Sequence, residues 1–190
     1  MKIKASITIL LFTLFVNNTC LAQTKLQPTD SISFSMPTGT AKFYDEEFFK
    51  SFEKTFSKEF ADRWYKTYEI YKFEDIIFRF ISPKIKLKNS KPVNYDATYI
   101  LKTSKSLDDI FGSKANAHLY KNYSRETNTI NGNEVVIASY QDSKGLLTYK
   151  FACFSPSKRK SFSGEVVGKS DDNVQITKIL NDLFKSVEFK

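Results

Sequence analysis

Hydrophobic and polar residues alternate with two different periods along the chain, and the changes of period separate predicted helices from predicted strands. The first clear pattern is helical, with an aromatic residue at nearly every fourth position: Phe48, Phe52, Phe56, Phe60, Trp64 and Tyr68. Asp45 suits the N-cap position, and Glu46 and Glu47 suit the first turn. We therefore expect one amphipathic helix from about 45 to 68.

Three roles compete for the aromatic stripe of this helix. At about 100° per residue the stripe covers roughly 160° of the helix surface, a width typical of a face that packs against a core. Bulky aromatic residues also form contact sites, so the second role is a binding surface or pocket lining that includes Phe48, Phe52, Trp64 and Tyr68. The third role, insertion into a membrane surface, is disfavoured because the polar face carries nearly as many acidic as basic residues. The pattern favours the core-facing role.

Segments outside this helix have the pattern of strands or edges. Ile32 and Phe34 lie on one side of a short strand that stops at Pro37, and 76–81 alternates between two largely apolar faces. The lysine-alternating segment 83–92 lies between prolines and is predicted to be a protected sheet edge or a loop. The following segment, 93–102, is predicted to be another strand.

A second helix is predicted to begin close to Ser106, because Ser106 and Asp109 have the spacing of a capping box. Apolar residues at helical spacing follow, and the chain's only histidine, His118, falls within that stripe. We therefore expect His118 to be a core or boundary residue with one hydrogen bond. A metal site would need several ligands, and the sequence has no second histidine to supply one.

The C-terminal part predicts an antiparallel meander followed by a helix. Asn131-Gly132 is a strong hairpin signal between two β-prone runs, and further turns are expected at 142–145 and 155–160. Four short strands joined by these turns would form the meander. A closing helix is expected to begin at Asp171 or Asp172 and to lie across the sheet. Its apolar stripe consists of Ile176, Ile179, Leu180, Leu183, Phe184 and Val187.

The N-terminal residues have the three parts of a secretory signal peptide. Lys2 and Lys4 are followed by an apolar run too short to span a bilayer comfortably, and then by a polar segment with small residues near its end. Cleavage after Ala22 is expected, which makes 1–22 the signal peptide and 23–190 a single α+β domain. A lipid anchor at Cys20 is the alternative, but the residues before it do not resemble a lipobox. The chain is therefore predicted to be exported to the periplasm or the extracellular space.

The charge of the chain does not point to a nucleic-acid partner. Loss of Lys2 and Lys4 with the signal peptide would lower the formal net charge from +8 to +6. The remaining basic residues are scattered among acidic ones, as on an ordinary solvated surface. No later run approaches the ~20 apolar residues of a membrane-spanning helix, so stable membrane insertion is not expected either.

Few residues have the pattern of a reactive site. Cys153 lies on the same strand face as Leu147, Tyr149 and Phe151, which predicts a small buried hydrophobic residue rather than a catalytic thiol. The sequence contains no glycine-rich phosphate loop, Gly-x-Ser-x-Gly elbow, paired-cysteine motif or His-Glu-x-x-His motif. We therefore predict no catalytic residues, no cofactor and no metal.

The order of these elements resembles the PsbP-like superfamily of α+β sandwiches. The resemblance rests on the "ISFSMP" strand, the "LDDIFGSK" helix, the meander from "TINGNEVV" to "SGEVVG" and the closing "ILNDLFKSVEFK". It implies an α+β fold in which an antiparallel meander packs with helices. Members that resemble this chain are mostly small accessory or adaptor proteins that bind other proteins, and many bacterial ones are exported. The aromatic-rich helical segment at about 43–73 is an insertion that the basic pattern does not require, so any special function is expected there.

Two hypotheses for the function follow from these observations. The first is an exported, non-catalytic accessory or binding module for a protein or an apolar ligand, because about half of the aromatic residues beyond the signal peptide lie between Phe43 and Phe80. The second is a small secreted enzyme of the hydrolase type whose active-site residues converge only in three dimensions. A deep pocket that gathers acidic residues or His118 with strongly perturbed titration would favour the second hypothesis.

Overall fold

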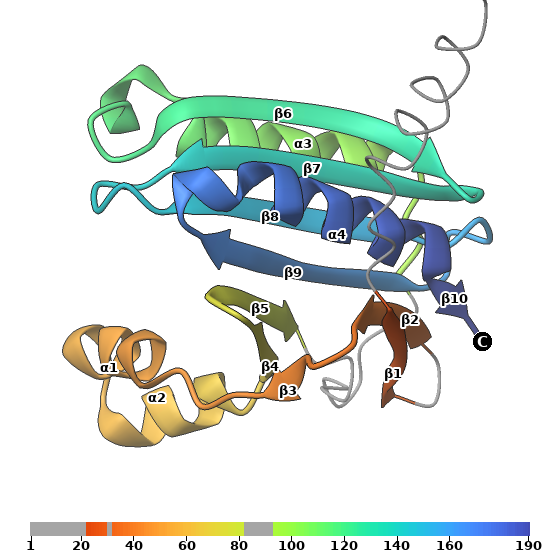
Figure 1. Ribbon diagram of the computed structural model, residues 1–190. Helices are drawn as coiled ribbons and strands as arrows, with labels where there is room; N and C mark the ends of the chain where they lie inside the picture. Colours follow the sequence, from red (N-terminus) through yellow and green to blue (C-terminus); the bar gives the residue numbers. More distant parts are fainter. Residues whose placement is uncertain (1–21, 30–31, 82–92) are drawn as a thin grey trace, which may run out of the picture.

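A long antiparallel sheet forms the body of the protein, with helices on both of its faces (Figure 1). The computed structural model describes residues 22–29, 32–81 and 93–190. Within these residues the sheet has seven strands in the order β3-β4-β5-β9-β8-β7-β6, and every neighbouring pair is antiparallel. The strands are β3 (Ala41–Lys42), β4 (Tyr68–Phe73), β5 (Ile76–Ile81), β6 (Lys121–Ile130), β7 (Asn133–Gln141), β8 (Leu147–Phe154) and β9 (Ser161–Gly168). This arrangement confirms the predicted α+β class.

The four strands from β6 to β9 form the predicted meander. Asn131 and Gly132 join β6 to β7, and their φ angles of 50° and 76° are the positive pair that a two-residue type I′ turn requires. Asp142 organises the next turn by accepting a hydrogen bond from the backbone N–H of Leu146 at 2.9 Å. Ser155 organises the last one by accepting from the backbone N–H of Lys160 at 3.1 Å. All three turns fall where the sequence predicts them.

A smaller sheet brings the two ends of the described chain together. Its central strand is β2 (Ile32–Pro37), which lies between β1 (Gln23–Thr29) and β10 (Glu188–Phe189). The predicted strand at this position is therefore confirmed. Phe34 of β2 is fully buried and packs edge-on against Phe80 of the large sheet, with ring centroids 5.0 Å apart.

The core lies between the inner face of the large sheet, β2 and helix α4 (Asn173–Ser186). Figure 1 shows α4 in front of β7 and β8. Its buried side chains, all of them predicted, are Ile176, Ile179, Leu180, Leu183 and Phe184. Cys153 of β8 is 0% exposed in the same core, which confirms its predicted burial.

Helix α3 (Ala97–Phe111) covers part of the outer face of the sheet and corrects two predictions. The segment 93–102 contains the start of this helix rather than a strand, and the helix begins well before Ser106. Asp96 caps it by accepting a hydrogen bond from the backbone N–H of Tyr99 at 3.0 Å. The first turns of α3 pack on β7 and β8, and this tertiary contact outweighs the strand-like local pattern.

The end of α3 leaves His118 outside the core. The helix stops at Phe111, before Gly112, so His118 lies in the connection between α3 and β6, and its side chain is exposed. The prediction of a core or boundary histidine is wrong, because an apolar stripe buries its members only while the helix continues.

The segment 45–68 forms two short helices instead of the one predicted. Helix α1 (Glu46–Thr55) and helix α2 (Lys58–Tyr65) are separated at Phe56 and Ser57, both of which have extended backbone. We call this pair the aromatic hairpin. It lies at one end of the molecule, beside β4 and β5 (Figure 1).

The start of α1 agrees with the sequence, whereas the end of α2 does not. Asp45 accepts a hydrogen bond from the backbone N–H of Phe48 at 3.0 Å, which confirms the predicted N-cap. The rings of Tyr44 and Phe49 pack across this cap with centroids 6.1 Å apart. At the other end Tyr68 already belongs to β4.

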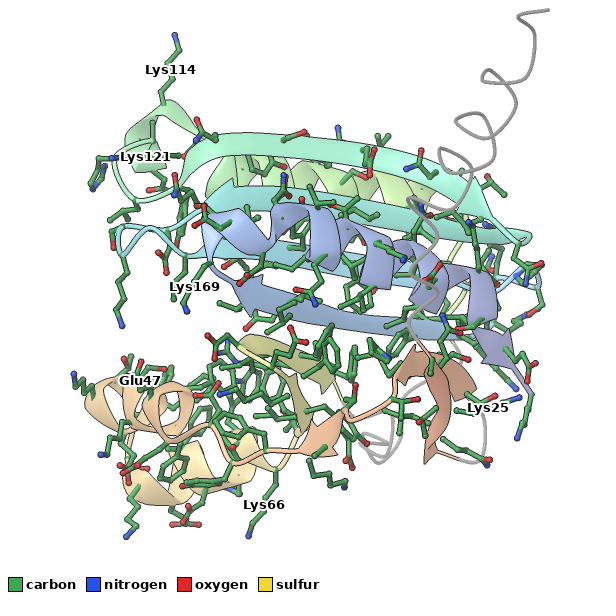
Figure 2. The ribbon with its side chains drawn as sticks, viewed as in Figure 1. Lys25, Glu47, Lys66, Lys114, Lys121 and Lys169 are labelled. Atoms are coloured by element: carbon green, nitrogen blue, oxygen red, sulfur yellow. The ribbon has the colours of Figure 1, made fainter. Side chains whose placement is uncertain are left out.

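Charged side chains are spread over the surface, as the sequence predicts for a solvated exterior. Figure 2 shows Lys66, Lys114, Lys121 and Lys169 pointing outward from different sides of the molecule. Lys169 forms an ion pair with Asp75 at 2.7 Å. The labelled lysines therefore do not gather on one face.

Several predictions concern residues outside the described ranges. The signal peptide at 1–22 lies outside them except for Ala22, and so do the alternative anchor Cys20 and the edge or loop at 83–92. Among the described residues, no helix is long and apolar enough to cross a membrane.

Candidate functional site

A cleft on the outer face of the large sheet is the first candidate site. It consists of two hollows of about 270 and 310 Å³, which share Arg79 and Glu165 as lining residues. Helix α3 forms a wall of the first hollow with Tyr99 and Leu107, and helix α1 forms a wall of the second with Phe48. We call the two hollows together the outer cleft.

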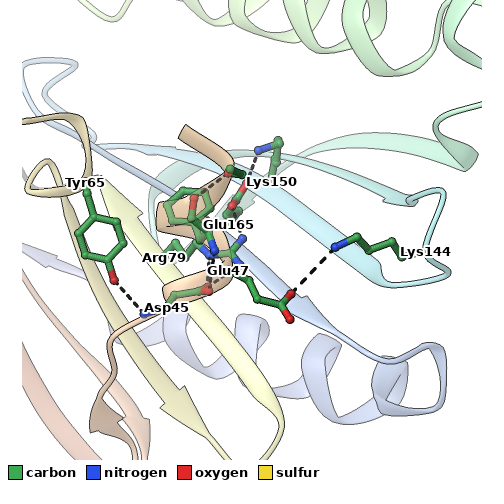
Figure 3. A network of polar contacts seen from close by, with 9 residues as sticks. Asp45, Glu47, Tyr65, Arg79, Lys144, Lys150 and Glu165 are labelled. Atoms are coloured by element: carbon green, nitrogen blue, oxygen red, sulfur yellow. Dashed lines mark hydrogen bonds and ion pairs between the residues drawn. The ribbon is translucent and has the colours of Figure 1, made fainter. Parts of the chain in front are cut away.

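A row of alternating charges crosses the floor of the outer cleft. The strand register places Lys150 of β8 opposite Glu165 of β9, and Glu165 opposite Arg79 of β5. The Lys150 ammonium pairs with one carboxylate oxygen of Glu165, and the Arg79 guanidinium pairs with the other at 2.7 Å. Figure 3 shows these side chains pointing toward one another. Opposite charges directly across a sheet stabilise the pairing of the strands.

Arg79 also ties the aromatic hairpin to the sheet. Its Nε and Nη2 atoms donate hydrogen bonds to Oδ2 of Asp45 at 2.9 and 2.6 Å (Figure 3). The backbone N–H of Asp45 donates in turn to the hydroxyl oxygen of Tyr65 at 2.8 Å. The ring of Phe48 covers the guanidinium, whose Cζ atom lies 4.2 Å from the ring centroid. The carboxylate of Asp45 therefore caps α1 and holds Arg79, and the backbone N–H of the same residue contacts the end of α2.

Mutual pairing keeps these groups charged. Burial alone would raise the pKa of Glu165, but the positive charges of Lys150 and Arg79 outweigh this effect and hold the pKa below its usual range. Burial likewise opposes the charge of Arg79, while Glu165 and Asp45 raise the pKa of its guanidinium. Neither group is poised to exchange a proton near neutral pH, so the arrangement is a structural ion-pair network rather than an acid–base pair.

The outer surface of the aromatic hairpin is the second candidate site. Phe56, Phe60 and Trp64 are 46%, 38% and 44% exposed, so the prediction that the stripe faces the core is wrong for these residues. Their rings form a continuous series, with centroids 4.8 Å apart for the first pair and 6.0 Å for the second. We call these three residues the aromatic ladder.

The four residues predicted as a binding surface or pocket lining lie together in the structure. Phe48 packs edge-on against Phe52 and Tyr68, with centroids 4.9 and 5.1 Å apart. Phe52 contacts Trp64 at 6.4 Å, which connects this half-buried cluster to the aromatic ladder. Tyr68 and Phe48 also line the outer cleft. Burial raises the pKa of Tyr68, so its phenol stays neutral. That these residues bind a ligand stays a prediction.

A comparison with solved structures finds one distant likeness to report. This is the solution structure of cyanobacterial PsbP (CyanoP) from Synechocystis sp. PCC 6803, with a TM-score of 0.46 and 11% sequence identity. The match covers 94% of this chain and 99% of that chain. At this level the likeness says nothing about family, ligands or partners. No protein-family model and no curated protein matches the chain.

Sequence reasoning missed the ion-pair network of Asp45, Arg79, Lys150 and Glu165. One signal was present, because Arg79 is the only charged residue in the otherwise apolar β5. A charge in such a strand requires either solvent or a partner, and here it has partners from β9 and from the cap of α1.

The cysteine and the histidine of the described residues do not line the outer cleft. Burial raises the pKa of the Cys153 thiol to about 12, so the nucleophilic thiolate is scarce at neutral pH. His118 does not line either hollow of the outer cleft. Within the part of the chain that the structure describes, no group of three or more His, Cys, Asp or Glu side chains could hold a metal ion.

Proposed function

We propose that this chain is an exported, non-catalytic binding module that attaches to a partner protein through the aromatic ladder. The observation that carries the proposal is the exposure of Phe56, Phe60 and Trp64. A large aromatic side chain that stays in water does not gain the stabilising free energy of hydrophobic burial. Stacked aromatic residues that share one exposed surface are typical of a contact site.

The helices that carry the ladder contribute little to the core. Helix α1 has no buried residue, and Ala61 is the only buried residue of α2. The main core cluster takes its members from the sheets, from α4 and from Val187 directly after it, and contains no residue of the aromatic hairpin. The side chains of the aromatic hairpin are therefore free to make contacts that the folding of the sheet does not require.

The charge around the ladder favours an apolar partner surface. Residues 46–66 contain five acidic and five basic residues, whereas the whole chain has a net charge of +8. A segment without net charge does not select a strongly charged partner. It also lacks the basic polar face of a membrane-surface helix. We therefore expect a protein partner with an apolar groove or patch.

The outer cleft supports a binding role better than the enzyme hypothesis. The acidic residues that line the cleft are Glu47, Asp142 and Glu165. Glu165 is paired with Arg79 and Lys150, and Asp142 accepts hydrogen bonds from the backbone N–H groups of its own turn. The pKa of Glu165 is lowered rather than raised toward neutrality, which is the opposite of what a general acid needs.

Site-specific photo-crosslinking in producing cells tests the proposal. A photoreactive phenylalanine analogue replaces Phe60, and the same analogue at Val174 of α4, which is 82% exposed, serves as the control. We expect a discrete crosslinked product from position 60 and none from position 174. Adding Trp64→Ala should abolish the product and change the melting temperature by less than about 4 °C, because Trp64 is not buried. Equal crosslinking from both positions, or none from position 60, would contradict the proposal.

A further inference from the structure

We propose that the outer cleft binds an extended, uncharged peptide segment, independently of the aromatic ladder. The length of the cleft is the first argument. Strand β9 lines it from Ser161 in the first hollow to Val167 in the second. At about 3.3 Å per strand residue, these six steps span roughly 20 Å. An extended peptide rises by the same amount per residue, so about six of its residues would fit along the cleft.

Free hydroxyl groups on the cleft floor supply the second argument. Ser161 and Ser163 lie two residues apart on β9 and line the first hollow, where Tyr99 adds a third hydroxyl from α3. Among the described residues, none of these three hydroxyls has a hydrogen-bond partner. Residues i and i+2 of a strand point to the same side, about 6.6 Å apart. An extended peptide presents backbone groups on one side at the same repeat, so each serine hydroxyl can form a hydrogen bond with one of them.

The charge balance of the cleft excludes a strongly charged ligand. The charged residues that line the two hollows are three positive ones, Arg79, Lys144 and Lys150, and three negative ones, Glu47, Asp142 and Glu165, so the lining charges compensate one another. A charged ligand residue here would lose water without gaining a counter-charge. The Lys150 ammonium has three N–H donors and uses one for Glu165, so it can still donate to a peptide carbonyl. The cleft therefore matches polar, uncharged groups.

Apolar side chains above this floor fit the alternate residues of such a peptide. Leu107 is half-buried in the wall formed by α3, and Ile81 at the end of β5 is 46% exposed. Successive side chains of an extended peptide point in opposite directions, so every second one can contact these walls. An acyl chain would contact the same walls but leave the serine and Lys150 donors without partners, which costs free energy. The peptide is thus the better match.

Peptide phage display on the intact protein tests the inference. A library of random twelve-residue peptides is selected on the wild type and counter-selected on Ser163→Trp, whose indole would fill the first hollow. Thr103→Trp fills the same hollow from α3 and serves as a second variant if Ser163→Trp does not fold. Val174→Trp, on the opposite face of the sheet, is the matched control.

We expect enriched peptides with at least five consecutive uncharged residues. By calorimetry, a synthetic peptide of this kind should bind Thr103→Trp and Ser163→Trp at least tenfold more weakly than the wild type. Val174→Trp and Trp64→Ala should bind it as the wild type does, and the Trp64→Ala result separates this site from the aromatic ladder. Enrichment of charged peptides would overturn the inference. So would a selection in which every enriched peptide binds the wild type and the two cleft variants equally well. Binding of laurate in the cleft without peptide enrichment would overturn it as well and would assign the site to an apolar small molecule.

Discussion

Replacing Arg79 by methionine should reveal how strongly the ion-pair network holds the fold together. The three side chains at its centre are nearly closed to solvent, because Arg79, Asp45 and Glu165 are 13%, 5% and 12% exposed. Arg79→Met keeps an apolar stem but leaves Asp45 without its ion pair and Glu165 with Lys150 alone. Removing one partner of a buried pair costs about 3–5 kcal/mol. Since Lys150 still neutralises Glu165, we expect a loss of about 3 kcal/mol at pH 7, from a typical total of about 5–15 kcal/mol.

The pH dependence of this loss identifies its cause. In the wild type the folded-state pKa of Glu165 is lowered, so this group stabilises the fold above its unfolded pKa of about 4.3 and loses that contribution as the pH falls through the folded value. Without Arg79, only Lys150 opposes the effect of burial on Glu165, so the pKa of Glu165 rises. Protonation then relieves the buried charge in the variant while it removes a favourable interaction from the wild type. The difference in stability should therefore shrink as the pH is lowered from 7 to 4.

Urea unfolding followed by circular dichroism at pH 7 and pH 4 measures both effects. Lys50→Met is the matched control, because Lys50 pairs with Glu46 on the exposed side of α1 and its loss should change stability very little. A loss below about 1 kcal/mol for Arg79→Met at pH 7, or an equal loss at both pH values, would refute the reasoning.

Three further predictions test other parts of the structure. Cys153 should react slowly with iodoacetamide in the folded protein and rapidly in urea, because burial raises the pKa of its thiol to about 12. Mass spectrometry of the peptide that contains Cys153 measures the reaction, and fast modification of the folded protein would contradict the prediction. Gly164→Ala should cost about 1–3 kcal/mol in urea unfolding, because the added Cβ would lie 2.6 Å from the carbonyl oxygen of Arg79, whereas the neighbouring Ser163→Ala should cost little. Asp45→Asn keeps the N-cap hydrogen bond but loses the charge, whereas Asp45→Ala loses both. Backbone hydrogen exchange in the aromatic hairpin should therefore increase more in Asp45→Ala than in Asp45→Asn. Equal exchange in both variants would show that the cap adds nothing.

Local patterns predicted the meander and the closing helix because their determinants lie within a few residues of each other. The Asn131-Gly132 turn specifies positive φ angles, and the flanking strands pair directly through it. The apolar stripe of α4 is buried because it packs on a sheet whose strands directly precede the helix in the sequence. The same reasoning failed at 93–102, where the Asp96 cap and contacts with a distant strand favour a helix.

The ion-pair network could not be predicted because it depends on the register of strands that are far apart in sequence. Arg79 and Glu165 are separated by 86 positions, and they face each other only because β9 pairs with β5. Asp45 is 34 positions from Arg79 and arrives from the cap of a helix outside the sheet. A single sequence shows that Arg79 interrupts an apolar strand, but it does not show which acidic residues compensate it.

The break between α1 and α2 explains why part of the aromatic stripe is exposed. The four-residue spacing continues through the break, so periodicity alone predicts one helix, although Ser57 followed by Lys58 and Glu59 has the composition of a new N-cap. Once Ser57 caps α2, the chain turns back, and the ring of Tyr65 packs 5.3 Å from that of Phe49 at the start of α1. The first half of the stripe then packs on β4, while the aromatic ladder, which begins at the break, stays exposed and contacts the first half through Phe52 and Trp64. The exposed surface proposed here as the contact site is thus a direct consequence of one capped turn within the stripe.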